Sequence, residues 1–490
     1  MKTAISLSEL STLVLGGHLE PATDGRLYAV TGPATGEVLT AVPWASSEDV
    51  DRAVQAAKAA AARWARIPPR DRAQALLAFS RRLEAESEFF AYLDAVNSGN
   101  PIREMQRDVV LATQVIEYYA SLATELKGET LPSTEETLHF SIREPYGVVG
   151  RIVAFNHPTL FAASRLAAPL VAGNAIIIKP AEQTPLSALA LGRIALEVFP
   201  PGLINILSGD GPTTGGALVR HPDVRRIAFI GSTETGRLIQ RQAAESAIKY
   251  VTLELGGKNP FIVFPDVDPH VVASAAVRGM NFVWQGQSCG STSRLFVHER
   301  LYEEVVALVV ERVRQIKVGH PLDEETQMGP LISRQHLERT LHYIESAVDE
   351  GARLVAGGGR PAGVHPGGFY LEPTVLADVQ PNMRVAQEEI FGPVLSVLPW
   401  RNFDALIEAV NGVRYGLTAS IWTNDLNQAI RTARLVESGY VWVNDVSAHY
   451  LGAGFGGYKD SGVGKEENLS ELLSYTREKY INFRIPSPSP

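Results

Sequence analysis

The stretch Ala175-Ile176-Ile177-Ile178-Lys179 is a short apolar segment that ends in a charged residue, and the loop Pro180-Ala181-Glu182-Gln183-Thr184-Pro185 follows it. We predict five such apolar segments as strands: residues 148–155, 175–179, 203–207, 226–230 and 250–255. Helix-length segments separate these strands: residues 160–171, 186–198, 215–220 with its flanks, and 235–247. Strands that alternate with helices predict right-handed βαβ units on a parallel sheet, and such a sheet binds ligands at the carboxyl ends of its strands.

The same alternation returns in the second half of the chain. It predicts strands at residues 295–298, 394–398, 419–422 and 440–444, and helices at residues 301–316, 335–350, 403–410 and 426–436. The rest is predicted as a helical region at residues 50–125, a polar extended excursion at 129–144, a loop at 456–462 and an extended terminus at 478–490. The predicted fold class is therefore α/β, with two parallel-sheet, Rossmann-like domains.

The composition is that of a folded globular protein. The chain has 490 residues, of which 45% are hydrophobic and 20% are charged, so we expect two or three structural units and no extensive disorder. The formal net charge of -9 provides no basic surface for nucleic acid or for an anionic membrane. No run approaches the ~18 apolar residues that span a bilayer. We therefore expect neither nucleic acid nor a membrane as a partner.

The only cysteine of the chain is Cys289, in the run Gln285-Gly286-Gln287-Ser288-Cys289-Gly290-Ser291-Thr292-Ser293-Arg294. The flanking glycines leave little bulk to shield the sulfur, and the neighbouring hydroxyl and amide groups supply hydrogen-bond donors, which favours a reactive nucleophile. The alternative is a small buried hydrophobe, because free cysteine is among the most buried residue types. A lone cysteine forms no internal disulfide, which fits a reducing, cytoplasmic compartment.

Two polar residues follow strands of the first predicted sheet. Glu254 lies in the run Leu253-Glu254-Leu255-Gly256-Gly257-Lys258-Asn259-Pro260, where partial desolvation would suit it to act as a general base on water. Asn156 closes the first strand and offers an amide donor for an oxyanion hole, and His157 beside it would line a pocket at most. The alternatives are an N-cap or salt-bridge partner for Glu254 and a turn-forming asparagine at position 156.

Two further loops at strand ends suit a nucleotide. The turn Phe229-Ile230-Gly231-Ser232-Thr233-Glu234-Thr235-Gly236 closes a strand and opens a helix, where free N–H groups and the helix dipole favour phosphate. Lys179 and Glu182 are placed to hold a ribose by its hydroxyls, and the carboxylate repels a 2′-phosphate, which favours NAD over NADP. The alternatives are a capping turn and a solvated loop, because no Gly-x-Gly-x-x-Gly fingerprint occurs. No spacing of His, Cys, Asp or Glu resembles a metal site, so we assign no metal.

Taken together, these motifs resemble those of the aldehyde dehydrogenase superfamily. The glutamate motif at 253–260, the cysteine motif at 286–294 and the run Glu389-Ile390-Phe391-Gly392-Pro393 occur in the family's order, and the phosphate turn, the Lys-Pro loop and a Phe-Gly-Gly-Tyr-Lys loop at 455–459 have counterparts. The resemblance covers roughly residues 36–483. It implies an NAD-binding domain at 1–124 and 146–257, a catalytic domain at 258–457, and a small β oligomerisation element at 125–145 and 458–490 that would form a homodimer or homotetramer.

The resemblance also implies a reaction, the oxidation of an aldehyde to the carboxylic acid with NAD, NADP being possible. Cys289 would attack the carbonyl, Asn156 and the backbone N–H of Cys289 would hold the oxyanion, and Glu254 would activate the water that hydrolyses the thioester. Lys179 is grouped with these catalytic residues as well as with the cofactor. The implied cofactor contacts are Lys179, Glu182, Gly231, Ser232, Leu255, Glu389 and Phe391. Arg165 and Glu466 match positions that are associated with proton transfer in relatives.

The expected substrate tunnel departs from the family pattern at Phe155, His157 and Gly290. The residues that fall where relatives line the tunnel are His157, Phe161, Trp284, Ser288, His449, Tyr450 and Phe455. If most of them face it, an aromatic or medium-sized apolar aldehyde fits better than a small polyol or a dicarboxylic semialdehyde. The alternatives are a semialdehyde or betaine-type aldehyde dehydrogenase, a coenzyme A-acylating relative, which typically lacks the carboxylate at Glu254, and a non-catalytic relative.

Overall fold

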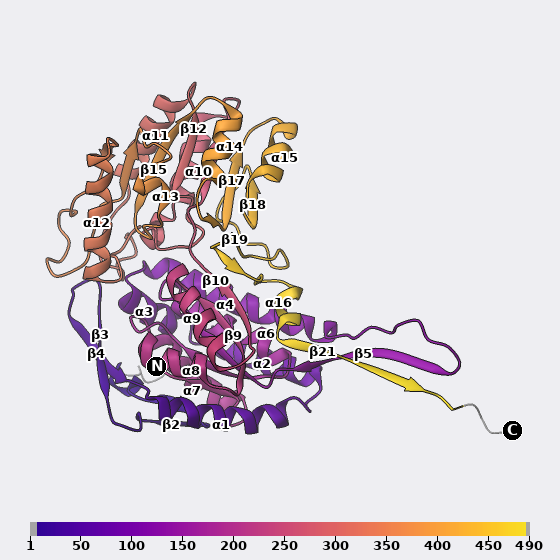
Figure 1. Cartoon of the computed structure of the whole chain (residues 1–490). Coiled ribbons are helices and arrows are strands. Elements are labelled where there is room, and N and C mark those ends of the chain that lie inside the picture. The colour runs from indigo at the N-terminus through magenta and orange to yellow at the C-terminus, as the bar shows by residue number, and fades with distance from the viewer. Residues whose placement is uncertain (1–6, 487–490) are drawn as a thin grey trace.

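The computed structural model describes residues 7–486 and contains two large sheets that helices cover (Figure 1). The first sheet has eight strands in the order β2-β1-β8-β7-β6-β9-β10-β20, and the second has seven in the order β13-β14-β15-β12-β11-β17-β18. Residues 1–6 of the predicted cofactor domain and residues 487–490 of the predicted oligomerisation element lie outside the described residues.

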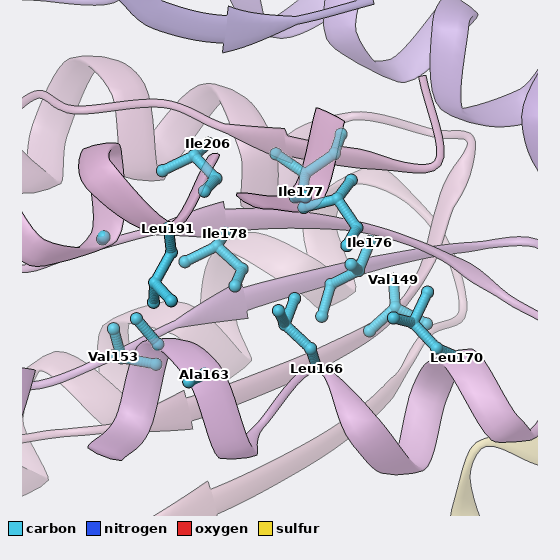
Figure 2. Close-up of a cluster of buried hydrophobic side chains, with 14 of the residues drawn as sticks. Val149, Val153, Ala163, Leu166, Leu170, Ile176, Ile177, Ile178, Leu191 and Ile206 are labelled. Atoms are coloured by element: carbon cyan, nitrogen blue, oxygen red, sulfur yellow. The ribbon is translucent and has the colours of Figure 1, made fainter. Parts of the chain in front are cut away.

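The interior of the first sheet is parallel, as the sequence predicted. Its strands are β6 (Val148–Ile152), β7 (Ala175–Lys179), β8 (Ile204–Ile206), β9 (Val224–Ile230) and β10 (Tyr250–Glu254). Every residue of β6, β7 and β8 is buried, because helices cover both faces of a parallel sheet and the strands are correspondingly apolar. Figure 2 shows the branched side chains of β7 and the apolar side chains of the adjacent helices gathered in one core.

The helices of the first unit are α5 (Pro158–Ser164), α6 (Ala167–Val171), α7 (Leu186–Val198), α8 (Gly216–Arg220) and α9 (Thr233–Ser246), with a one-turn π-helix at Gly211–Gly215. The single helix predicted at residues 160–171 is wrong, since α5 and α6 are separate. Pro169 explains the break, because its ring has no N–H to donate and would clash with the carbonyl of Arg165 four residues earlier in a continuous helix.

The order of the strands places a topological switch point between β6 and β9. The chain moves from β6 outward to β7 and β8, and then returns to the other side of β6 for β9 and β10. Ligands of open α/β sheets bind at such a point, outside the carboxyl ends of the strands. The loop that carries Asn156 and the turn that carries Gly231 and Ser232 leave the sheet there.

The second sheet is also parallel in its interior. Its parallel strands are β11 (Pro260–Val263), β12 (Arg294–His298), β14 (Thr374–Ala377), β15 (Val394–Trp400), β17 (Thr418–Trp422) and β18 (Tyr440–Val443). The helices of this unit are α10 (Pro269–Gly279), α11 (Tyr302–Arg314), α12 (Arg334–Asp349), α13 (Arg384–Gln387), α14 (Phe403–Asn411) and α15 (Leu426–Leu435), with a 3-10 turn at Phe282–Trp284. The predicted alternation missed β11, α10, α13 and β14.

Both sheets have antiparallel strands at their edges, where the sequence predicted only parallel ones. The edge strands are β1 (Leu13–Leu15), β2 (His18–Glu20) and β20 (Gly462–Val463) in the first sheet and β13 (Arg353–Ala356) in the second. The segment 456–462, predicted as a loop, contains β19 (Tyr458–Lys459), which pairs with β16 (Tyr415–Gly416), and the start of β20. Because β20 pairs with β10, it closes the sheet beside Glu254.

The N-terminal region is helical, as predicted, and it also contains a hairpin that was not predicted. Its helices are α1 (Ser47–Trp64), α2 (Pro69–Glu84), α3 (Ser87–Ser98) and α4 (Ile102–Ser121), with 3-10 turns at Leu7–Leu10 and Leu122–Glu125. The hairpin is formed by β3 (Leu27–Thr31) and β4 (Val38–Pro43). Across the described part of the chain, none of the helices combines the length and the apolar character needed to cross a membrane.

A two-stranded arm projects from the body of the molecule (Figure 1). It consists of β5 (Thr137–Pro145) and β21 (Thr476–Arg484), which pair antiparallel along their full length. The predicted excursion at 129–144 and the predicted extended terminus are therefore one structural element. The short helix α16 (Leu469–Ser474) leads into β21.

Candidate active site

The chain passes from the carboxyl ends of the strands of the first sheet directly to the amino ends of the strands of the second. β10 of the first sheet ends at Glu254 and β11 of the second begins at Pro260, so residues 255–259 connect them, and the chain returns from β18 to β20 through residues 444–461. Because β11, β12, β15 and β17 are parallel neighbours, their amino ends share one edge. Cys289 precedes β12 and Glu389 precedes β15, so both lie at that edge. The candidate site therefore lies between the carboxyl ends of the first sheet and the amino ends of the second.

The structure brings Cys289 and Glu254 together. Glu254 is 5% exposed, and its Oε1 is buried without a hydrogen-bond partner in the range 7–486. Burial, together with the charge of nearby Glu466, raises the pKa of Glu254 to about 8. Burial and the adjacent Glu254 carboxylate also raise the pKa of the Cys289 thiol well above its usual value. The Cys289 thiol and the Glu254 carboxyl group are therefore coupled in one desolvated place.

Asn259 holds the loop that carries the nucleophile. Its Nδ2 donates to the carbonyl oxygens of Cys289 at 2.7 Å and Ser291 at 2.9 Å, and its Oδ1 accepts from the backbone N–H of Thr418 at 3.0 Å. One buried amide thus ties the connection between the sheets to the amino ends of β12 and β17. Asn259 could not be singled out from the sequence, because a lone asparagine before a proline has no distinctive signal.

Glu389 lies against the glycines of the glutamate motif. The N–H of Gly257 donates to Glu389 Oε1 at 2.9 Å, and a Cβ on Gly256 would stand only 1.9 Å from Glu389 Oε2. Position 256 therefore accepts only glycine while this carboxylate keeps its place. Burial raises the pKa of Glu389 to about 7, and the buried Lys258 ammonium opposes that shift. Lys258 is another functional candidate that sequence reasoning did not select.

The loop around Phe391 is fixed from the second unit. Phe391 has a left-handed backbone conformation with φ of 58°, and its carbonyl oxygen accepts a hydrogen bond from His336 Nε2 at 2.7 Å. Burial lowers the pKa of His336 to about 4, so the ring is neutral. Phe391 also packs edge-on against Phe155, which precedes Asn156. This contact joins the two halves of the site.

The predicted phosphate turn is linked to the base. The N–H of Gly231 donates to the carbonyl oxygen of Glu254 at 3.1 Å, and Ser232 caps α9 by accepting from the N–H of Thr235. The N–H of Leu255 donates to Ser461, and Ser461 Oγ donates to the carbonyl of Gly256 at 2.6 Å. The C-terminal loop at 460–462 thus holds the glycine turn in place.

Lys179 and Glu182 lie at a different part of the sheet edge. β7 and β10 are three strand positions apart, or about 14 Å. Lys179 is buried and donates to the carbonyl of Pro180, and burial lowers its pKa to about 8. Glu182 is exposed and lines a cavity of about 400 Å³ together with Asp210 and Trp44. The structure therefore does not bring Lys179 to Cys289, and it separates this lysine from the catalytic group in which the sequence analysis placed it.

These features form an elongated surface that fits a dinucleotide. A carboxylate and a buried lysine stand at one end, the start of a helix of 14 residues lies at the switch point, and Glu389 stands at the other end. The residues that could hold the cofactor are Lys179, Glu182, Gly231, Ser232, Glu389 and Phe391. Leu255 is buried and packs towards Gly236 of α9, so only its backbone is close to this surface. Within residues 7–486, no group of three or more His, Cys, Asp or Glu side chains is arranged to hold a metal ion.

Arg165 and Glu466 form a buried ion pair behind the base. Arg165 lies 3.1 Å from Glu466 and 3.2 Å from Glu467, and Glu466 also pairs with the fully buried Arg151. The sequence contained a signal for Arg151, because an arginine inside the apolar strand at 148–155 must be paired when buried. The structure thus brings both predicted relay residues close enough to Glu254 for the charge of Glu466 to raise its pKa.

Aromatic rings predicted to line the tunnel come from three segments and contact one another in two groups. The His157 ring centroid lies 5.4 Å from that of Phe161 and 5.1 Å from that of Trp284. The Phe455 ring centroid lies 4.6 Å from that of His449. Arg165 links this pair to the His157 group, because its guanidinium lies 5.7 Å from the Phe161 ring and pairs with Glu467, which in turn bonds His449.

The other two predicted tunnel residues differ from each other in their placement. Ser288 is half-buried beside Cys289. Tyr450 is 59% exposed and its hydroxyl donates to Asp445.

Comparisons with known proteins agree on one family. The model of the aldehyde dehydrogenase family matches residues 19–481. The aldehyde dehydrogenase tropH of Talaromyces stipitatus is 47% identical over 474 residues, which cover 95% of this chain and 91% of that protein. The NAD+ complex of an aldehyde dehydrogenase from Bacillus cereus has a TM-score of 0.94 at 38% identity, covering 97% of this chain and 96% of the other. The indole-3-acetaldehyde dehydrogenase AldA of P. syringae, solved with NAD+ and IAA, has a TM-score of 0.94 at 35% identity, covering 97% of both chains.

Proposed function

Since this chain belongs to the aldehyde dehydrogenase family, we propose that Cys289 and Glu254 are the catalytic centre at which it oxidises an aldehyde to the carboxylic acid. The protein is an oxidoreductase that acts on aldehydes with a nicotinamide cofactor. The observation that carries the proposed centre is the buried carboxyl group of Glu254 beside the only cysteine, with its Oε1 unpartnered in residues 7–486. A carboxyl group is retained at such a place when it has a chemical task.

Each residue of the centre then has a defined task. Cys289 Sγ adds to the carbonyl carbon, and the resulting oxyanion accepts hydrogen bonds from the Asn156 amide and the Cys289 N–H, each worth about 2.7–4 kcal/mol. The nicotinamide, when bound, accepts the hydride that leaves this carbon, so that a thioester remains on Cys289. Glu254 takes a proton from water as the water attacks the thioester, the C–S bond breaks, and the thiolate is regenerated. Glu466, paired with Arg165, is placed to pass that proton on.

The cofactor contacts follow from the same edge of the first sheet. We assign the adenine-ribose hydroxyls to Lys179 and Glu182, the pyrophosphate to Gly231 and Ser232 at the start of α9, and the nicotinamide ribose to Glu389, with Phe391 near the nicotinamide. Leu255 contributes through its backbone. The exposed carboxylate of Glu182 supports NAD as the preferred cofactor, because it would repel the 2′-phosphate of NADP.

The residues of the predicted substrate tunnel favour an aromatic or medium-sized apolar aldehyde as the substrate class. The rings of Phe161, Trp284 and Phe455 supply apolar walls. Arg165 is engaged by two glutamates, so it is not free to bind a second carboxylate of a dicarboxylic semialdehyde. Glu254 favours water over coenzyme A as the acceptor of the acyl group.

A panel of aldehydes tests the proposal. We expect NADH formation with benzaldehyde and hexanal at specificity constants at least about tenfold above those for succinic semialdehyde and betaine aldehyde, a ratio that the burial of a few apolar carbons supplies. We expect kcat/KM to be higher with NAD than with NADP, and added coenzyme A to change neither rate nor product. Silence across the panel with normal NAD binding would favour a non-catalytic relative, and dependence on coenzyme A would favour an acylating one.

We also propose that the chain divides into the parts that the resemblance implied. We propose a cofactor domain at 1–124 and 146–257, a catalytic domain at 258–457, and an oligomerisation element at 125–145 and 458–490. The separate cores support the first two, because one buried cluster extends from Leu10 to Leu255 and joins Leu472 and Tyr475, whereas two others lie within residues 261–446. The reduced thiol that catalysis requires suits a cytoplasmic location.

The projecting arm supports assembly into a homodimer or homotetramer. A two-stranded ribbon is marginally stable alone. Residues 129–134 bond to the outer side of β5, whereas β21 pairs only with β5 within residues 7–486, so its other edge is unpaired. Exposed apolar side chains lie along it, at Leu138, Ile142, Tyr480, Phe483 and Ile485. A second copy of the chain would cover this surface.

Replacing two of these side chains with charge should disrupt that assembly. Tyr480 and Phe483 are three positions apart on one strand, so they face opposite sides and at least one faces a partner. We expect Tyr480→Glu/Phe483→Glu to lower the mass measured by light scattering to that of a smaller oligomer or monomer, and Val38→Glu, at an exposed site away from the arm, to leave it unchanged. A monomeric parent protein, or equal masses for parent and double variant, would contradict this assignment.

A further inference from the structure

Two histidines of the predicted substrate tunnel, His157 and His449, are anchored by carboxylates in the same way. His157 Nδ1 lies 2.7 Å from Asp108 Oδ2, and His449 Nδ1 lies 2.9 Å from Glu467 Oε2. A carboxylate only accepts hydrogen bonds, so Nδ1 carries the hydrogen in both rings. Nε2 of a neutral ring is then an acceptor, and neither Nε2 has a hydrogen-bond partner in the described structure.

His157 is the inner of the two. Its side chain is 12% exposed, against 33% for His449. It directly follows Asn156, and its ring lies between those of Phe161 and Trp284. Asp108 comes from α4 and is itself buried, so it fixes the orientation of the imidazole. The structure thus holds the imidazole at a fixed position among aromatic rings, next to the buried Nε1 of Trp284, which is unpartnered among the described residues.

A polar atom without a partner at a mostly buried place costs free energy that a suitable ligand group can recover. The group must donate a hydrogen bond, because the free atom is an acceptor. A second carboxylate does not fit, since it would face this acceptor with the negative Asp108 behind it, and Arg165 is already paired with Glu466 and Glu467. A hydroxyl group on an aromatic ring fits both the acceptor and the flanking rings.

We propose that His157 Nε2 accepts a hydrogen bond from a ring hydroxyl of the substrate, so that the preferred substrates are hydroxylated aromatic aldehydes. The proposal rests on the proposed function and narrows its substrate class. His157 is then a specificity-determining residue, and Asp108 is the residue that positions it. The hydroxyl and the aldehyde occupy the same ring at a spacing set by His157 and Cys289.

The test compares benzaldehyde with its 2-, 3- and 4-hydroxy derivatives, and propanal serves as an aldehyde without a ring. The acid product is measured by chromatography, because hydroxybenzaldehydes absorb near the NADH band. We expect kcat/KM for at least one hydroxy isomer to exceed that for benzaldehyde by about tenfold, the size of one neutral hydrogen bond. Each ratio is taken within one protein preparation, so a change in the amount of active protein cancels.

Variants at His157 assign the effect to this residue. We expect His157→Phe to reduce that ratio to about one, and His157→Gln, whose amide reaches about as far as Nε2, to keep part of it. His342→Phe, at an exposed position of α12, should keep the full ratio. The proposal is overturned if no hydroxy isomer has a higher kcat/KM than benzaldehyde in the parent protein. It is also overturned if the preference for a hydroxy isomer survives in His157→Phe. Absence of acid from every aldehyde, propanal included, would instead contradict the proposed function.

Discussion

Replacement of Cys289 with alanine is expected to abolish aldehyde oxidation, with a loss in kcat of at least about 10⁴-fold. The covalent adduct needs a nucleophile that is also a leaving group, and no other thiol exists in the chain to replace it. The measurement is NADH formation over hours with concentrated protein. NAD binding, followed by quenching of tryptophan fluorescence, should remain, because the proposed cofactor contacts come from other residues.

The single cysteine also permits a chemical version of this test. One equivalent of a thiol alkylator should inactivate the parent protein in step with labelling, and the alanine variant should take up no label. Aldehyde or NAD should change the labelling rate, because both occupy the space around the sulfur. Full activity after complete alkylation would end the assignment of Cys289 as the nucleophile.

Replacement of Glu254 with glutamine is expected to separate the two halves of the reaction. The first turnover should still release about one NADH for each active site, whereas steady-state turnover should fall by about 10²–10⁴-fold, the usual contribution of a general base. Stopped-flow absorbance measures both quantities in one trace. The control is Glu388→Gln, next to Glu389 in the sequence, which removes an exposed carboxylate that accepts a hydrogen bond from Tyr343. It should leave both the first turnover and the steady-state rate unchanged. Unchanged steady-state turnover in Glu254→Gln would show that Glu254 is not the base.

The reactivity of Cys289 offers a second readout of the same substitution. The Glu254 carboxylate raises the pKa of the thiol, so its removal should lower that pKa and speed alkylation at neutral pH. A variant that was merely misfolded would not combine faster labelling with an intact first turnover.

The pH dependence of turnover follows from the raised pKa of Glu254. With a pKa of about 8, the base form is lost as the pH falls below that value, and about a tenth remains at pH 7. Steady-state turnover should therefore be half-maximal near pH 8 and level off about one pH unit above it. The negative charge of Glu466 raises this pKa, so Glu466→Gln should move the rising limb to lower pH. In Glu254→Gln the limb should be absent.

Much of the fold could be predicted from local sequence. The bounds of β7 and α7 are those that the pattern predicted, because an apolar run with helices on both faces and a helix of 13 residues both have strong periodic signals. The split between α5 and α6 was missed although Pro169 signalled it. The strand β11 was missed because only five residues separate it from β10, without a helix between them.

The candidate site was predictable only in part. Cys289, Glu254 and Glu389 lie in short motifs, so their chemistry was legible along the chain. Asn259 and the Asp108–His157 pair were not, because each acts through a partner that is distant in sequence. Lys179 was grouped with the catalytic residues on sequence grounds, and only the strand order showed that β7, which ends in this lysine, lies three positions from β10.

The sequence by itself determined the alternation of strands and helices, the presence of a single thiol, and the motifs that identify the chemistry, because these depend on residue type and local spacing. The tertiary structure decided where that chemistry takes place. It joined the carboxyl ends of one sheet to the amino ends of another, through a connection of five residues that Asn259 and Ser461 hold. It also buried Glu254 beside Cys289, and desolvation at that junction, which no local pattern encodes, raises the pKa of both groups.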